Sequence, residues 1–292
     1  MIKLIIMGVL LLGMGTYGFA DIAISNAPAG PPVPPGLPKW EVGVFGMAAR
    51  VPFYRGSDEY KTYAFPLPFF IYRGDYIQAD KDGVRGSFYK GYRFELELSM
   101  SGNPPVTDEG GARTGMPDLN PLLELGPAAR FYLYNGEKVR AIFLEAAVRG
   151  VISIDMDDLS PGYEGLKSSL SLVLAGFKPT PTSLWTAGLK TGLDFSDRDY
   201  HGYFYDVDEA YVTSARPYYH SQGGYSGAFA SGWLSRRLFD GVSAALYARM
   251  DNVAGAVYED SPLVRAQNSY MVGLGFTWKI AQSKNQVKRA KP

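Results

Sequence analysis

The chain has 292 residues, with 29 basic and 29 acidic side chains and a formal net charge of zero. This balance excludes the strongly basic surface of a nucleic-acid-binding protein, and a hydrophobic fraction of 46% excludes a disordered polyelectrolyte. The absence of cysteine excludes disulfides, a thiolate nucleophile and metal sites that need cysteine ligands. With 34 glycines and 14% aromatic residues, the composition favours β structure with many turns.

Residues 1–20 have the layout of a secretory signal peptide, in which Lys3 precedes an apolar run and Gly18 and Ala20 occupy the positions before the cleavage site. The apolar run is shorter than the ~20 residues of a membrane-spanning helix. We therefore expect an exported chain. Residues 21–39 form a proline-rich leader, predicted to be a stiff spacer in the periplasm, with partner binding as the alternative.

Residues 40–280 alternate between large apolar and small or polar side chains. The clearest run is 269–280, where Tyr270, Val272, Leu274, Phe276, Trp278 and Ile280 share one parity. Because successive side chains of a strand point to opposite faces, these segments are predicted to be strands with one apolar face.

Three features predict a membrane barrel rather than a soluble sandwich. Most of the segments reach ten residues, which is the length that a tilted strand needs to cross a bilayer. Aromatic residues such as Trp40 and Trp278 lie near segment ends, where interfacial girdles form. The polar faces carry charged residues in mid-strand, which a water-filled lumen accommodates and a dry core does not. Because sheet edges are not tolerated in lipid, the sheet is expected to close.

The strand count follows from the connections. Short turns alternate with long polar segments, so we predict a single antiparallel transmembrane β-barrel with short periplasmic turns, long extracellular loops and a basic periplasmic tail, 281–292. About twelve strands are expected, and ten is the alternative if the short third and fourth strands are one. The expected ranges are 40–50, 63–73, 76–81, 84–90, 92–101, 122–134, 138–154, 166–178, 182–195, 223–237, 242–251 and 269–280.

The polar faces of these strands carry charges of both signs, which predicts salt bridges across the lumen rather than a strongly selective ion path. The expected lumen charges are Arg93, Glu95, Glu97, Glu124, Arg130, Glu145, Arg149, Lys190, Asp194, Arg249 and Lys279.

Several motifs resemble the MipA/OmpV family of outer-membrane proteins. They are Tyr54-Arg55-Gly56-Ser57, Pro66-Leu67-Pro68, Tyr72-Arg73-Gly74-Asp75, Arg113-Thr114-Gly115-Met116-Pro117-Asp118-Leu119 and Glu124-Leu125-Gly126-Pro127. The stretch from Gly115 to Pro127 is the most specific of them. We expect the loop around it to fold inward or to cap the rim of the barrel, with Gly115 at positive φ.

The resemblance implies an outer-membrane barrel of a Gram-negative bacterium. Its named member is a scaffold that links a lytic transglycosylase to a peptidoglycan synthase, so it implies a non-enzymatic scaffold with these partners and no cofactor. Other members are described as porins or adhesins. The basic tail and the long leader depart from the family pattern.

Two alternatives to the scaffold remain. The charged lumen suggests a pore for small solutes. His201 and His220, in the longest loop, suggest a lipid hydrolase or a metal site, but no metal-ligand spacing is present and Ser221 is adjacent to His220 in the chain. We expect no catalytic or metal-binding residue.

Overall fold

The computed structural model describes residues 38–73, 77–80, 83–106, 111–135, 141–180 and 182–285. These residues form antiparallel strands, with three short helices in the connections, so the prediction of an all-β antiparallel protein is confirmed. The strands are β1 (Trp40–Pro52), β2 (Tyr60–Arg73), β3 (Ile77–Asp80), β4 (Gly83–Lys90), β5 (Phe94–Asn103), β6 (Leu122–Asn135), β7 (Ala141–Ile154), β8 (Pro161–Phe177), β9 (Trp185–Ser196), β10 (Gly224–Phe239), β11 (Val242–Asn252) and β12 (Asn268–Gln282). The helices are η2 (Gly111–Arg113), α3 (Arg198–Tyr205) and η3 (Glu209–Tyr211).

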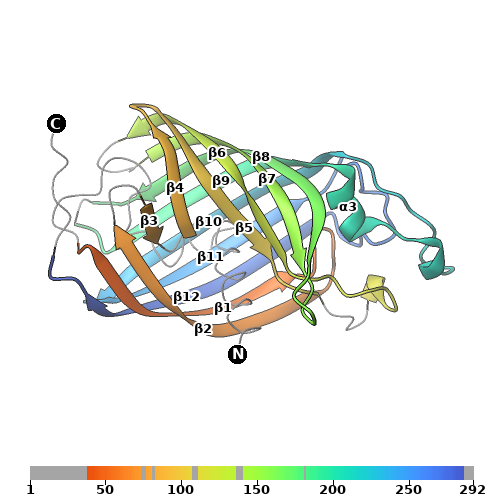
Figure 1. Cartoon of the computed structure of the whole chain (residues 1–292), viewed down its shortest axis with the longest axis horizontal. Coiled ribbons are helices and arrows are strands. Elements are labelled where there is room, and N and C mark those ends of the chain that lie inside the picture. The colour runs from red at the N-terminus through yellow and green to blue at the C-terminus, as the bar shows by residue number, and fades with distance from the viewer. Residues whose placement is uncertain are drawn as a thin grey trace.

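Each strand pairs with its neighbours in the chain, and β1 also pairs with β12, so the order of strands returns to its start (Figure 1). The expected strand ranges overlap the observed ones. The largest difference is at β8, which begins at Pro161, five residues before its expected start.

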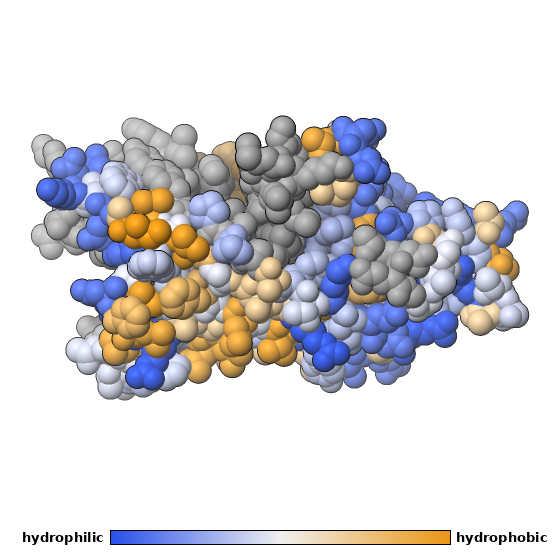
Figure 2. All heavy atoms as spheres, turned by 90° about the horizontal axis from the view of Figure 1, so that it is seen from below, coloured by the Kyte–Doolittle hydropathy of each residue, from blue (hydrophilic) through white to orange (hydrophobic). Residues whose placement is uncertain are grey.

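Alternation along the strands separates an inner face from an outer wall. In β7, buried residues alternate with exposed or half-buried ones from Ala141 to Ile154. In β12, every second residue from Tyr270 to Ile280 has a large apolar side chain, and all of these residues are exposed. Figure 2 shows apolar residues gathered on the wall between hydrophilic regions on either side. Exposed apolar side chains on this scale suit a wall that faces lipid.

The two ends of the strand ring differ. At the turn end lie the short connections after β2, β4, β6, β8 and β10, the beginning of β1 and the end of β12. At the loop end lie five longer connections, 53–59, 104–121, 155–160, 197–223 and 253–267. Helix α3 lies at the loop end, beyond the strands (Figure 1). No helix in the described ranges is long and apolar enough to span a membrane.

The last strand is longer than expected. β12 continues to Gln282, which pairs with Glu41, and Ser283 N–H donates to Trp40 O at 2.8 Å. The Lys39 N–H donates to Asn285 O at 2.9 Å. Backbone hydrogen bonds with the first described segment of the chain therefore continue past residue 280, to residue 285. The expected signal peptide, most of the leader and residues 286–292 lie outside the described residues.

Candidate functional site

The middle of the lumen contains an ion-pair network between β5, β6, β7 and β9. The Arg130 guanidinium contacts the Glu97 carboxylate at 2.7 Å and the Glu145 carboxylate at 2.8 Å. Lys190 Nζ contacts the other oxygen of Glu145 at 2.8 Å. The Tyr132 hydroxyl donates to Glu95 at 2.7 Å. All six residues come from the inner faces of their strands, where pairing offsets the cost of removing charge from water.

A second network lies nearer the loop end. Arg249 makes two hydrogen bonds to Asp251, at 2.7 and 2.6 Å. Arg55, from the 53–59 connection, contacts the same carboxylate at 2.7 Å and also pairs with Asp194. Burial alone would lower the pKa of the Arg55 guanidinium, but the two carboxylates hold that pKa well above its ordinary value. Arg55 therefore fixes the first long connection to β9 and β11.

Three further charged residues lie beside this network. Lys167 Nζ contacts Glu124 Oε1 at 3.1 Å, and both side chains are buried. Arg149 donates to the Ser99 hydroxyl at 2.9 and 2.7 Å. The inner faces of β5 to β8 thus continue the polar lining toward the loop end.

Apolar side chains fill another part of the lumen. They form one buried cluster: Phe45, Met47, Ala49, Val51, Tyr132, Ala141, Phe143, Val173, Trp233, Ala245 and Tyr247. The Trp233 indole occupies the space that a side chain would need at its cross-strand partner Gly188, where an added Cβ would lie 1.9 Å from the ring. Glycine at this position lets the largest lumen side chain lie against β9. The lumen is therefore packed with side chains from several strands.

The long connections join in an apolar assembly over the loop end, which we call the loop cap. Its buried residues are Tyr54, Val106, Met116, Leu119, Leu122, Val151, Tyr200, Phe204, Tyr205, Val207, Val253, Ala256, Tyr258 and Leu263. Tyr205 and Tyr258 stack with ring centroids 3.8 Å apart, and the Tyr205 hydroxyl donates to Arg55 O at 2.9 Å. Aromatic stacking and hydrogen bonding thus tie three loops together.

The loop with the family-like motif contributes to this cap. Met116 and Leu119 are buried in it, and Gly115 has a φ of 77°. Arg113 donates to Phe204 O at 2.9 Å and to Pro117 O at 3.2 Å. The structure therefore places the loop on the rim and joins it to α3. Pro117 and Asp118 are exposed beside these contacts.

Close backbone packing explains the motif Glu124-Leu125-Gly126-Pro127. A Cβ added at Gly126 would lie 2.0 Å from the carbonyl oxygen of Val148, so only glycine fits there. The β6–β7 register omits Gly126 and Pro127 between the pairs of Leu125 and Ala128, consistent with proline having no N–H to donate. Glu124, two residues before Gly126, points into the lumen and holds Lys167.

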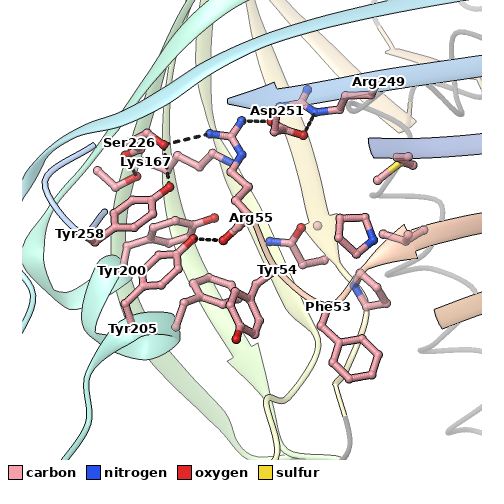
Figure 3. Close-up of a pocket in the computed structure, with 18 residues that line it drawn as sticks. Phe53, Tyr54, Arg55, Lys167, Tyr200, Tyr205, Ser226, Arg249, Asp251 and Tyr258 are labelled. Atoms are coloured by element: carbon pink, nitrogen blue, oxygen red, sulfur yellow. Dashed lines mark hydrogen bonds and ion pairs between the residues drawn. The ribbon is translucent and has the colours of Figure 1, made fainter. Parts of the chain in front are cut away.

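A pocket lies between the loop cap and the second ion-pair network (Figure 3). Aromatic side chains from three loops form part of its wall, and Figure 3 shows Tyr200 and Tyr205 near Arg55. Arg55, Lys167, Arg249 and Asp251 supply its charged lining. Residues 51–53 and 102–104, at the ends of β1 and β5, form the opposite wall.

The two histidines occupy different environments. His201 is fully buried; its Nδ1 lies 2.6 Å from Gln222 O and its Nε2 lies 2.8 Å from Ser226 Oγ. Burial lowers the pKa of His201, against the opposing effect of the Gln222 carbonyl. His220 is exposed and contacts Arg198 and Asp206. In the described residues no group of three potential ligands could hold a metal ion.

Most of the expected lumen charges lie on the inner faces of their strands. Arg93 lies in the connection before β5, which begins at Phe94, and it is exposed at the turn end. Lys279 lies at the turn end, where it donates to Gln282 at 2.7 Å. Sequence reasoning omitted three residues of the loop-end network, Arg55, Lys167 and Asp251. Lys167 and Asp251 lie at the alternate, polar positions of their strands, so alternation could have identified them. Arg55 lies in a loop, where no alternation indicates the direction of a side chain.

Comparison with known proteins identifies the class. A family model described as MltA-interacting protein MipA matches residues 42–280. Outer membrane protein Omp26La of Vibrio anguillarum is 23% identical over 240 residues, which cover 80% of this chain and 82% of that protein. The chain is an outer-membrane β-barrel protein. It belongs to the MipA family, as the match to most of its length shows.

Two solved structures resemble the fold more distantly. The Pseudomonas putida toluene transporter TodX has 9% sequence identity and a TM-score of 0.34, with 91% of this chain and 93% of that chain covered. A Pseudomonas aeruginosa FadL homologue has 10% identity and a TM-score of 0.37, with 92% and 98% covered. Likenesses at these TM-scores say nothing about function.

Proposed function

We propose that the protein is a non-enzymatic scaffold that binds peptidoglycan-remodelling enzymes at the periplasmic face of the outer membrane. The family description supports a lytic transglycosylase of the MltA kind as one partner. By the resemblance of the motifs, a peptidoglycan synthase is the second. The observation that carries this proposal is the packed lumen, because ion pairs and the apolar cluster occupy space that a transport path would need.

The binding face in this proposal is the turn end. Bacterial barrels keep short turns in the periplasm and long loops outside, which assigns the turn end to the periplasm. Both termini of the described chain also lie there, joined by the hydrogen bond between Lys39 and Asn285. The leader and the tail then leave the barrel on the side where cell-wall enzymes act.

Capture of the purified transglycosylase by the barrel in detergent tests the proposal. We expect Arg93→Glu and Lys284→Glu, both at exposed turn-end positions, to weaken capture several-fold. Arg265→Glu is the matched control, because Arg265 is also exposed but lies at the loop end. The proposal fails if the unmodified barrel captures no enzyme, or if the loop-end control weakens capture as much as the turn-end changes.

A pore for small solutes is the second candidate function, favoured by the charged inner faces of β5 to β9. Planar-bilayer recording of the purified barrel separates the two proposals. Steady single-channel currents would favour the pore, and a silent bilayer with inserted protein would exclude it.

The absence of catalysis is part of the proposal. His201 and Ser226 are hydrogen bonded, but both are buried, and the Nδ1 contact of His201 is a backbone carbonyl rather than a carboxylate. This geometry suits a structural link between α3 and β10. We expect no lipid hydrolysis by the purified barrel; hydrolysis that His201→Ala abolishes and His220→Ala leaves intact would contradict this.

A further inference from the structure

The outer wall contains an apolar groove that crosses β8, β9, β10 and β11, which we call the wall groove. The registers of these strands place its outward residues in two neighbouring rows. The row nearer the loop end is Leu174, Leu189, Gly232 and Ala248. The row nearer the turn end is Phe177, Ala187, Leu234 and Leu246. Gly188 and Trp233 complete the lining, so the groove is a hollow in the surface that faces lipid.

Small residues produce this hollow. Ala187 lies between its cross-strand partners Phe177 and Leu234, and in the neighbouring row Gly232 lies beside Ala248. The β8–β9 register also shifts beside these rows, and such a bulge bends its strand locally. Three small outward residues in adjacent positions leave room for a slender apolar group between the larger side chains.

A cation and an aromatic ring lie at the turn end of the wall groove. Arg236 is exposed and follows Leu234 by two residues on the outward face of β10, which is a rise of about 7 Å. Its Cζ lies 5.0 Å from the ring centre of Trp185, which is its cross-strand partner in β9. Tryptophan and outward-reaching arginine are typical of the membrane interface. Arg236 therefore lies at the level of lipid head groups.

The charge of Arg236 is not used within the barrel. Among the described residues, its side chain contacts the Trp185 ring and forms no ion pair with a carboxylate. The residues of this corner, 178–185 and 236–241, carry three cations, Lys178, Arg236 and Arg237, and one carboxylate, Asp240, which is a formal charge of +2. Arg236 thus differs from the lumen arginines, which are held by carboxylates.

The combination of groove and charge defines the chemistry of an occupant. The groove lining is apolar and suits an acyl chain, whereas the cations at its turn end attract an anionic head group. The turn end faces the periplasm under the rule for bacterial barrels, and the leaflet on that side of the outer membrane is phospholipid. A phospholipid with a net negative head group reaches both features from its ordinary position in that leaflet.

We propose that the wall groove and Arg236 form a binding site for one anionic phospholipid of the periplasmic leaflet. One acyl chain would lie over Ala187 and Gly232, and the phosphate would lie beside Arg236, with Lys178 and Arg237 nearby. The site shares only the orientation of the barrel with the proposed scaffold function and requires no protein partner.

Native mass spectrometry of the purified barrel in detergent tests the head group. The barrel is titrated separately with phosphatidylglycerol and with phosphatidylcholine of the same acyl chains, and the affinity of the first bound lipid is measured. Arg236→Gln removes the charge at the groove. Arg50→Gln is the matched control, because Arg50 is also exposed and has its Cζ 4.8 Å from the ring centre of Tyr60, but lies near the loop end of β1.

We expect phosphatidylglycerol to bind about tenfold more tightly than phosphatidylcholine, since several cations near a membrane surface each attract an anionic lipid. Arg236→Gln is expected to lower the affinity for phosphatidylglycerol about fivefold, as for the loss of one such cation, and to leave that for phosphatidylcholine unchanged. Equal affinities of the unmodified barrel for the two lipids, or equal losses in Arg236→Gln and Arg50→Gln, would overturn the anionic site.

A second pair of variants tests the groove. Ala187→Leu fills it, and Ala146→Leu adds the same side chain at an exposed position of β7, outside the groove. We expect Ala187→Leu to weaken binding of both lipids several-fold and Ala146→Leu to leave it unchanged. Equal affinities of these two variants would overturn the acyl-chain site. Capture of the transglycosylase by Ala187→Leu, expected to be normal, reports separately on the scaffold function.

Discussion

Trp233 and Gly188 are cross-strand partners in β10 and β9, and the indole of the first lies where the second would carry a side chain. The absence of a side chain at Gly188 makes room for Trp233, which is the largest side chain of the apolar lumen cluster. It also shows how the interior of the barrel can be filled without distortion of the wall.

Substitution of Gly188 should therefore destabilise the barrel. Gly188→Ala places a methyl group within 1.9 Å of the indole, and overpacking of this kind costs about 1–3 kcal/mol. The free energy of unfolding from urea titration in detergent measures the effect. Gly46→Ala is the control, because an added Cβ there has no atom within 4 Å. Equal stability of the two variants would contradict the packing.

Removal of the Trp233 side chain should open the lumen. We expect Trp233→Ala to give measurable conductance in planar bilayers, while the unmodified barrel stays silent, because the indole fills lumen space over Gly188 of β9. Tyr270→Ala is the control, since Tyr270 points outward from β12. A Trp233→Ala barrel as silent as the control would show that other groups block the path.

Arg55, which pairs with two buried carboxylates, should contribute more to stability than an exposed arginine. Arg55→Ala leaves Asp194 and Asp251 without one of their cationic partners, and loss of one partner from a buried network costs about 3–5 kcal/mol. Arg198→Ala is the matched control: its side chain is 45% exposed, and pairs of this kind contribute up to about 1 kcal/mol. Urea titration compares the two, and equal losses would contradict the assigned role of Arg55.

The loop cap should loosen in acid because of His201. Burial lowers the pKa of this histidine below its ordinary value of 6.5, so the unfolded loop binds a proton more readily than the folded one. The stabilisation by neutral His201 is complete above pH 6.5 and is lost as the pH falls through the lower pKa of the folded state.

Hydrogen exchange of residues 198–205 between pH 8 and pH 5 measures this effect. Protection, corrected for the intrinsic exchange rate, is expected to fall across that window in the unmodified chain. His220→Gln, at an exposed position, should retain the pH dependence, and His201→Gln should remove it. An identical pH profile for His201→Gln and the unmodified chain would contradict the role of His201.

The sequence predicts the strands better than the site. Alternation alone places Glu97, Arg130 and Glu145 on inner faces, because a strand fixes the direction of every second side chain. Loops carry no such period, so the meeting of Tyr205 with Tyr258, 53 residues apart, has no local signal.

Composition also cannot predict which residues meet across neighbouring strands. In the sequence, Gly188 is like any other glycine in a strand. Its role is recognised only from the register, which places Trp233 opposite it. The four-residue length of β3 could be inferred from the spacing of the turns, but only the register with β1 shows that the Pro66-Leu67-Pro68 motif lies opposite Val44 to Gly46.

The hydrogen bond between Lys39 and Asn285 brings the first and last described segments of the chain into contact. A short peptide linker could therefore join them without crossing the wall, and new ends could be cut in an outer loop such as 155–160. Such a circular permutant would keep the strand order and would move both termini to the opposite side of the membrane, which makes the barrel a candidate carrier for displaying peptides on the cell surface.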